Sequence, residues 1–185
     1  MRLSSLKRLL AAALLLLSAC SAPAQKQNPA SIQQLMDRTV DPAADALWGA
    51  VGDIETAKGI EHKAPATPQE WDKLEAQARQ LVDGAAQLES PRPVGGDGHG
   101  ALADATTPGI RTAAQIESDI KADPKRFAAA AERLRLAGLQ AQSAIQKRDS
   151  AALIEAGAAM DAACEACHSA YWYPRTPALP LPPTH

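Results

Sequence analysis

Three residues near the end of the chain could hold one cofactor covalently: Cys164, Cys167 and His168, in the segment Cys164-Glu165-Ala166-Cys167-His168. Cys-x-x-Cys-His is the attachment motif of a c-type haem. Two thiols at this spacing add across the two vinyl groups along one porphyrin edge, and the adjacent imidazole is offered to the iron. The motif therefore predicts one haem c per chain, with Cys164 and Cys167 as thioethers and His168 as the proximal iron ligand.

Two other uses of a Cys-x-x-Cys pair remain open, a dithiol redox pair and half of a zinc site. Thioredoxin-like chemistry belongs to a βαβ context that this sequence lacks, and structural zinc usually takes four Cys or His ligands. His62, His99 and His185 stand alone in predicted loops or in the tail, where a solvated histidine is commoner than a ligand. No paired carboxylates, nucleophile motif or phosphate-binding loop is present, so an enzyme is not predicted.

The N-terminal residues have the pattern of an export signal. Arg2, Lys7 and Arg8 accompany a short apolar run, residues 9–17, which is too short for a permanent membrane span. The run ends in Leu17-Ser18-Ala19-Cys20, which resembles the bacterial lipobox. We therefore expect a lipoprotein signal peptide over 1–19, and a flexible tether over 20–28 attached to lipid through Cys20. Ordinary cleavage after Ala24 is the alternative, and it would give a soluble periplasmic protein.

These features predict a protein on the periplasmic side of a bacterial membrane, and Ser21 after the cysteine resembles lipoproteins sent to the outer membrane. The chain has 19 Lys and Arg against 21 Asp and Glu, and removal of the signal leaves it more acidic. It shows neither a basic stripe nor interleaved aromatics, so nucleic acid is not an expected partner. The expected partners are redox proteins and, through the lipid, a membrane.

The rest of the chain is patterned for helices, because Ala is abundant while β-branched and aromatic residues are few. We expect a loop over 59–66 and a flexible connection over 95–100. The first predicted helix begins either at Asn28-Pro29 or behind a capping box of Ser31 and Gln34, and it runs to residue 51 with a kink at Pro42. The other predicted helices cover 68–89 behind a capping box of Thr67 and Glu70, 108–147 divided at Asp123-Pro124, and 150 to the haem motif. Such helices pack most simply as an antiparallel four-helix bundle over 29–174, followed by a Pro-rich tail over 175–185. The predicted fold class is therefore all-α.

With this pattern, Cys164-x-x-Cys167-His168-Ser169-Ala170-Tyr171 resembles the ending of the class II c-type cytochromes, the cytochrome c′ family. The resemblance extends over residues 30–173. It implies a four-helix bundle with a covalent haem near the C-terminal end of the last helix, acting as a one-electron carrier. Family members are often dimers, so a homodimer is possible here.

The same resemblance bears on the sixth iron ligand. Residues 32–52 are similar to the N-terminal helix of family members that place a Met on the iron, which makes Met36 the expected distal ligand. Packing of Met36 in the core is the alternative; the iron would then be five-coordinate and could bind a small gas such as nitric oxide. Met160 lies on the helix of His168 and is expected in the core.

Expectations for several other residues come from this resemblance or from their position in the chain. The family's basic residue one turn before the ligand is replaced by Ile32, so Arg38 or Lys63 is expected to meet the haem propionates. Three consecutive aromatic residues that begin three positions after His168 are expected to cover a haem edge, and two tryptophans are expected to pack between helices. These are Tyr171, Trp172 and Tyr173, and Trp48 and Trp71.

Overall fold

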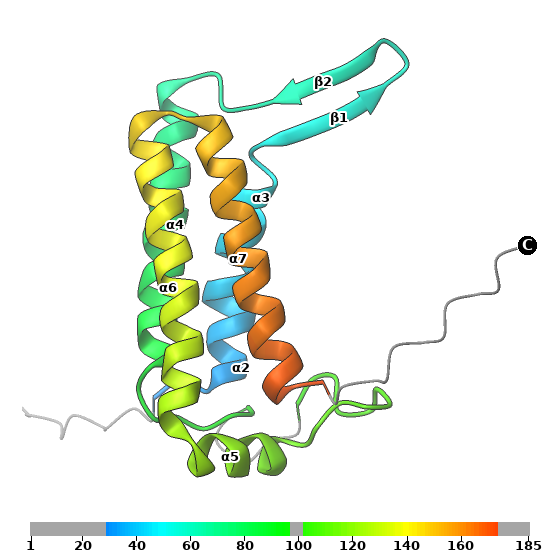
Figure 1. Ribbon diagram of the computed structural model, residues 1–185, viewed down its shortest axis with the longest axis vertical. Helices are drawn as coiled ribbons and strands as arrows, with labels where there is room; N and C mark the ends of the chain where they lie inside the picture. The colour runs from blue at the N-terminus through cyan, green and yellow to red at the C-terminus, as the bar shows by residue number, and fades with distance from the viewer. Residues whose placement is uncertain (1–28, 97–101, 174–185) are drawn as a thin grey trace, which may run out of the picture.

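The computed structural model describes residues 29–96 and 102–173, which are mostly helical with one small two-stranded sheet (Figure 1). This confirms the predicted predominance of helix. The elements in chain order are α2 (Ile32–Leu35), the π-helix η1 (Met36–Val40), α3 (Asp41–Trp48), β1 (Gly52–Thr56), β2 (Gly59–Lys63), α4 (Pro68–Leu88), α5 (Ala113–Ala122), α6 (Pro124–Lys147) and α7 (Ser150–Tyr171). None of these described helices is long and apolar enough to cross a membrane.

Several predicted features fall on parts of the chain outside the described residues. These are the signal peptide (1–19), the tether (20–28) with Cys20, His99, and the tail (175–185) with His185.

The helix boundaries follow from side-chain caps. Thr67 and Glu70 form the predicted capping box, in which the Glu70 carboxylate accepts from the Thr67 backbone N–H at 3.0 Å. The predicted break at Asp123-Pro124 is confirmed, since α5 ends there and α6 begins at Pro124. The prediction that this region turns helical directly after Pro108 is wrong. Helix α5 starts at Ala113, because Thr112 supplies its capping box.

The long helices α4, α6 and α7 run side by side, and the N-terminal segment α2–η1–α3 packs along them (Figure 1). Helix α6 contacts both α4 and α7, and α3 contacts the same two helices. The side chains between them form the main core, including Leu47, Leu81, Leu153 and Met160. Leu139 of α6 is 37% exposed and lies outside this core.

Residues 59–63 of the expected loop over 59–66 are instead the second strand of a β-hairpin, whereas residues 64–66 have no regular secondary structure, as predicted. Strand β1 pairs antiparallel with β2, from Gly52 opposite Lys63 to Thr56 opposite Gly59. Gly59 has φ 116°, and the Thr56 hydroxyl donates to the Gly59 carbonyl at 3.0 Å, which closes the turn. The strands are rich in Gly and charged residues, so they lack the runs of β-branched and aromatic residues that predict a strand. The first helix accordingly ends at Trp48 rather than at Val51.

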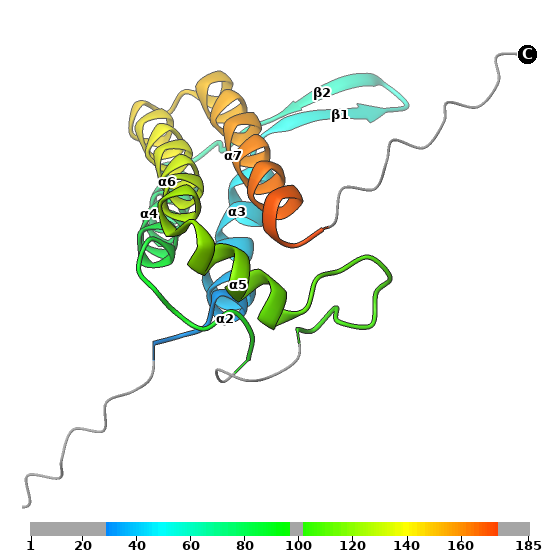
Figure 2. The same cartoon turned by 60° about the horizontal axis from the view of Figure 1, so that its bottom comes forward.

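Helix α5 lies across the end of the molecule opposite the hairpin, next to the start of α2 and the end of α7 (Figure 2). A second hydrophobic cluster fills this end and includes Ile32, Leu35, Phe127 and Tyr171. The connection from α4 to α5 is tied to the first helix, because the Ile32 and Gln33 amides donate to the Pro93 and Val94 carbonyls at 2.8 and 3.0 Å. These bonds satisfy N–H groups that the first turn of a helix leaves free.

Candidate functional site

The three motif residues lie on the last two turns of α7, where helical spacing places Cys164, Cys167 and His168 close to one face. All three line one cavity, together with Met36 from the N-terminal segment. The cavity has a volume of about 270 Å³ and is partly open to solvent. This is near the lower end of the roughly 300–1,000 Å³ that is typical of small-molecule sites. The structure thus brings the four predicted iron and haem-binding residues into a single site.

The cavity lies between α7, the start of α6, the N-terminal segment and the loop before α5. Its lining is largely apolar, as cofactor sites usually are. The apolar wall residues include Ile32, Leu88, Leu102, Phe127, Ala131 and Leu134. Gln33, Asp37, Asp41 and Asp104 are the polar members besides the α7 motif and the aromatic residues that follow it.

Met36 stands opposite the α7 motif because of how the N-terminal segment is held. Ser31 and Gln34 form a capping box at the start of α2, with both bonds near 3.0 Å. Ile32 and Leu35 are buried beside Met36 and fix the rotation of the helix. Met36 itself is half-buried: it packs against the edges of both hydrophobic clusters and also lines the cavity.

The turn that follows Met36 is a π-helix, over Met36–Val40. The Asp41 N–H donates to the Met36 carbonyl, five residues back, instead of to a carbonyl four residues back. Pro42 has no N–H and would crowd a preceding carbonyl in a regular helix, so a wider turn accommodates it. The predicted disturbance at Pro42 is therefore an inserted residue rather than a simple kink. Single π turns often occur at functional sites.

Gly84 of α4 lets this wide turn approach closely. A Cβ at Gly84 would lie 3.0 Å from the methyl groups of Thr39 and Val40. The Gln80 side-chain amide also donates to the Thr39 carbonyl at 3.2 Å, which uses a backbone group that the π turn displaces. Helix α4 therefore supports the turn that presents Met36.

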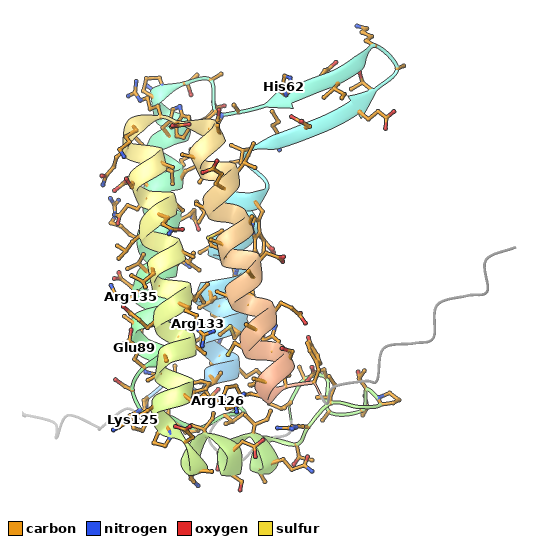
Figure 3. The ribbon with its side chains drawn as sticks, in the orientation of Figure 1. His62, Glu89, Lys125, Arg126, Arg133 and Arg135 are labelled. Carbon is orange, nitrogen blue, oxygen red and sulfur yellow. The ribbon has the colours of Figure 1, made fainter. Side chains whose placement is uncertain are left out.

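Burial dominates the electrostatics of the two thiols. It raises the pKa of Cys164 to about 11, with Asp41 as the next contribution, and it raises the pKa of Cys167 to about 11 against an opposing effect of Arg133. Arg133 lies on α6 (Figure 3). Redox-active thiols have lowered pKa values. The Cys164–Cys167 pair therefore lacks the electrostatics of a dithiol redox centre.

Asp41 is the carboxylate with the largest effect on the pKa of Cys164 in the α7 motif. Partial burial raises its pKa, Asp37 and Asp45 act in the same direction, and His168 opposes them. No motif in the sequence singles out Asp41 as a functional residue, although it lines the cavity. Leu102 and Asp104 of the cavity wall were also not predicted. They lie in a loop, and the sequence of a loop has no periodic pattern that shows which site it contacts.

The aromatic residues after His168 close one side of the site. Trp172 and Tyr173 line the cavity, with ring centroids 6.5 and 5.9 Å from the His168 ring. Tyr171 points the other way and packs edge-on against Phe127 at 5.2 Å, with the Arg126 guanidinium 5.9 Å from its ring centre. Within the described residues the buried Tyr171 hydroxyl has no hydrogen-bond partner.

Other candidates lie away from the cavity. Met160 is fully buried in the main core, as predicted. Trp71 is buried there too, and the Trp48 indole donates to the Gly157 carbonyl at 3.0 Å. His62 is on the projecting hairpin, bonded to Asp53 at 2.6 Å (Figure 3). The two cations expected at the haem propionates, Arg38 and Lys63, do not line the cavity.

No group of three or more His, Cys, Asp or Glu residues arranged to hold a metal ion occurs within 29–96 and 102–173. Comparison of the whole chain with family models, with curated proteins and with solved structures finds no match. The functional argument therefore depends on the site itself.

Proposed function

We propose that this protein is an exported, lipid-anchored monohaem c-type cytochrome that carries single electrons. The observation that supports this most directly is the shared cavity of Cys164, Cys167, His168 and Met36. Two thiols one turn apart, an imidazole beside them and a thioether on the facing wall make up the donor set of a haem c with His/Met ligation. The fold we propose is a four-helix bundle of the class II type, formed by α2–η1–α3, α4, α6 and α7.

The described residues fit a haem in their chemistry as well as their placement. Burial raises the pKa of both thiols to about 11, so both are neutral at pH 7 in the chain without a bound group. The cavity is lined mainly by apolar residues, which suit a porphyrin face. When bound, the haem would supply an Fe(III)/Fe(II) couple.

The protein's own contribution to electron transfer is to hold the donors and restrict water. His168 and Met36 would provide one nitrogen and one sulfur ligand, and a thioether ligand favours Fe(II) and raises the potential. Phe127, Leu134 and Ile32 form an apolar wall that lowers the local dielectric constant. Trp172 and Tyr173 narrow the opening beside His168.

Two competing functions are less well supported. A dithiol redox role requires a lowered thiol pKa, whereas both pKa values are raised. A structural zinc site requires further ligands near the Cys pair, and the described residues offer no such group. We propose no enzymatic reaction, and the expected partners are redox proteins together with a membrane reached through Cys20.

The test is the optical spectrum of the purified holoprotein, oxidised, then reduced with dithionite, then exposed to carbon monoxide. We expect sharp low-spin bands that carbon monoxide does not change, because Met36 fills the sixth position. Replacement of Met36 by Leu should convert the haem to a high-spin form that binds carbon monoxide. The matched control is Met160→Leu, which changes a methionine of the core outside the cavity and should leave the spectrum low-spin.

The outcomes separate the possible functions. A polypeptide that shows no haem-dependent peroxidase staining on a denaturing gel would contradict the cytochrome proposal altogether. A high-spin wild-type spectrum that shifts with carbon monoxide would leave the haem in place but favour binding of a small gas such as nitric oxide. In that case Met36→Leu would change the spectrum very little.

A further inference from the structure

Asp41 is a carboxylate at the cavity that none of the roles described above uses. It lines the same wall as Met36 and faces the α7 motif. Its charge acts on the Cys164 thiol, and the His168 imidazole acts on it in turn. Asp41 is therefore placed to act electrostatically on whatever Cys164 and His168 hold.

The π turn is what puts Asp41 on this wall. In a regular α-helix, residues five apart point about 140° away from each other, so Met36 and Asp41 would face different neighbours. The hydrogen bond from the Asp41 N–H to the Met36 carbonyl closes the wider turn instead. Because that turn holds one more residue, both side chains line the same cavity.

The surroundings of Asp41 leave its charge uncompensated. The charged groups that act on it are Asp37 and Asp45 from its own segment and the titratable His168 from α7. Asp161 of α7, like Asp41 itself, acts on the nearby Cys164 thiol. Among the described residues Asp41 makes no ion pair and no side-chain hydrogen bond. Asp41 is an exposed residue of the cavity lining, and no cation among the described residues offsets its charge.

We propose that Asp41 is a positioning charge that stabilises the oxidised haem and so lowers its reduction potential. The inference rests on the proposed function, and it concerns an equilibrium in which the iron takes up one electron from a donor protein. Ferric iron carries one more positive charge than ferrous iron, so a nearby carboxylate favours the ferric state. Met36 and Asp41 then act in opposite directions on the potential, from the two ends of one π turn.

The test is a spectroelectrochemical titration of the holoprotein at pH 7, comparing wild type with Asp41→Asn. The amide is close in size but uncharged, so it removes the charge with little change in packing. We expect the ferric-to-ferrous ratio at a fixed ambient potential to fall by about tenfold, which is about 59 mV for a one-electron couple. The low-spin bands should stay in place, because the iron ligands are unchanged.

Two further variants give the experiment its controls. Asp45→Asn removes the same charge from the same helix at a position outside the cavity lining, and it should change the ratio by less than about threefold. Asp41→Glu retains the charge and should keep the ratio within about threefold of wild type. Asp41→Ser is a second uncharged variant, for use if Asp41→Asn does not retain haem.

Each outcome has a separate meaning. Equal shifts for Asp41→Asn and Asp45→Asn, or no shift for either, would overturn the role of Asp41 while leaving the cytochrome intact. Loss of haem from both uncharged variants, with Asp41→Glu fully loaded, would also overturn it in favour of a structural role. A wild-type protein without a covalent haem or a reversible redox couple would instead overturn the proposed function, and this is seen before any variant is compared.

Discussion

At the scale of single residues, burial controls the reactivity of Cys164 and Cys167. Both side chains are half-buried against the cavity wall, and burial raises the pKa of each thiol to about 11. A thiol reacts with alkylating reagents as the thiolate, so its rate follows the ionised fraction. The folded chain should therefore protect these thiols from alkylation at neutral pH.

This protection can be measured on the haem-free protein kept under reductant. We expect iodoacetamide to modify Cys164 and Cys167 with a rate that rises with pH toward a midpoint at a pKa of about 11, rather than at the ordinary thiol pKa of 9.0. At pH 8 the folded chain should then react about 100-fold more slowly than the same chain unfolded in urea. Equal rates in the folded and unfolded chains would contradict the burial argument.

Tyr171 gives a second prediction at this scale. Its hydroxyl is buried without a partner, and an unsatisfied buried hydroxyl costs free energy. Tyr171→Phe should therefore keep or raise the free energy of unfolding, by up to about 1 kcal/mol in urea titrations. Tyr173→Phe is the control, because Tyr173 is 41% exposed and should show no change. A loss of more than about 1 kcal/mol for Tyr171→Phe would mean that the hydroxyl has a partner in solution.

At the scale of elements, the N-terminal segment shows how far helical patterning predicts geometry. The apolar positions and the Ser31 cap predict a helix and its start, and both are confirmed. The π turn over Met36–Val40 could not be predicted from the spacing of apolar residues, because it adds only one residue between two segments that each keep helical spacing. Pro42 marks the disturbance without giving its form.

The π turn can be tested by changing the number of residues in it. Deleting the exposed Arg38 should convert it to an α turn while keeping Met36 and Asp41 on one side, so the holoprotein should stay low-spin. Inserting an Ala after Arg38 should rotate Met36 by about 100° away from the cavity and give a high-spin spectrum. The reverse pattern, with the deletion high-spin and the insertion low-spin, would show that the π turn does not set the placement of Met36.

At the scale of the whole molecule, the hairpin projects from one end and α5 lies across the other (Figure 1). The cavity is lined by residues of α2, the start of α6 and the end of α7, away from the hairpin. The hairpin exposes Ile54 and Ile60, at 49% and 66%. An isolated two-stranded hairpin has marginal stability in water, so β1 and β2 add little to the free energy of folding. The haem site should therefore be independent of this element.

Replacement of residues 53–62 by Asn-Gly tests that independence, since Gly52 and Lys63 are already paired neighbours. We expect an unchanged low-spin spectrum and a free energy of unfolding within about 1 kcal/mol of wild type. The measurements are the optical spectrum and a urea titration. Conversion to high spin would show that the hairpin supports the cavity at a distance.

The sequence alone predicted the elements that depend on local signals. The caps at Ser31 and Thr67, the break at Asp123-Pro124 and the helical spacing of the haem motif each depend on neighbouring residues, and all are found in the fold. Met36 was also placed correctly on the facing wall, through the resemblance of its segment to a known family. The polar hairpin was not predicted, because it depends on glycines at its turn and on backbone pairing, and neither produces a pattern of hydrophobic residues.

Only the tertiary structure decided which residues share the cavity with the motif. Asp41, Leu102 and Phe127 come from three separate parts of the chain, and no spacing in the sequence relates them to Cys164. Their meeting depends on how α2–η1–α3 and α6 pack against α7, and on one inserted residue in a π turn. The sequence therefore predicted the residues that carry the candidate donor atoms. Packing of the helices determined the position of the Asp41 carboxylate and of the apolar residues around those donors.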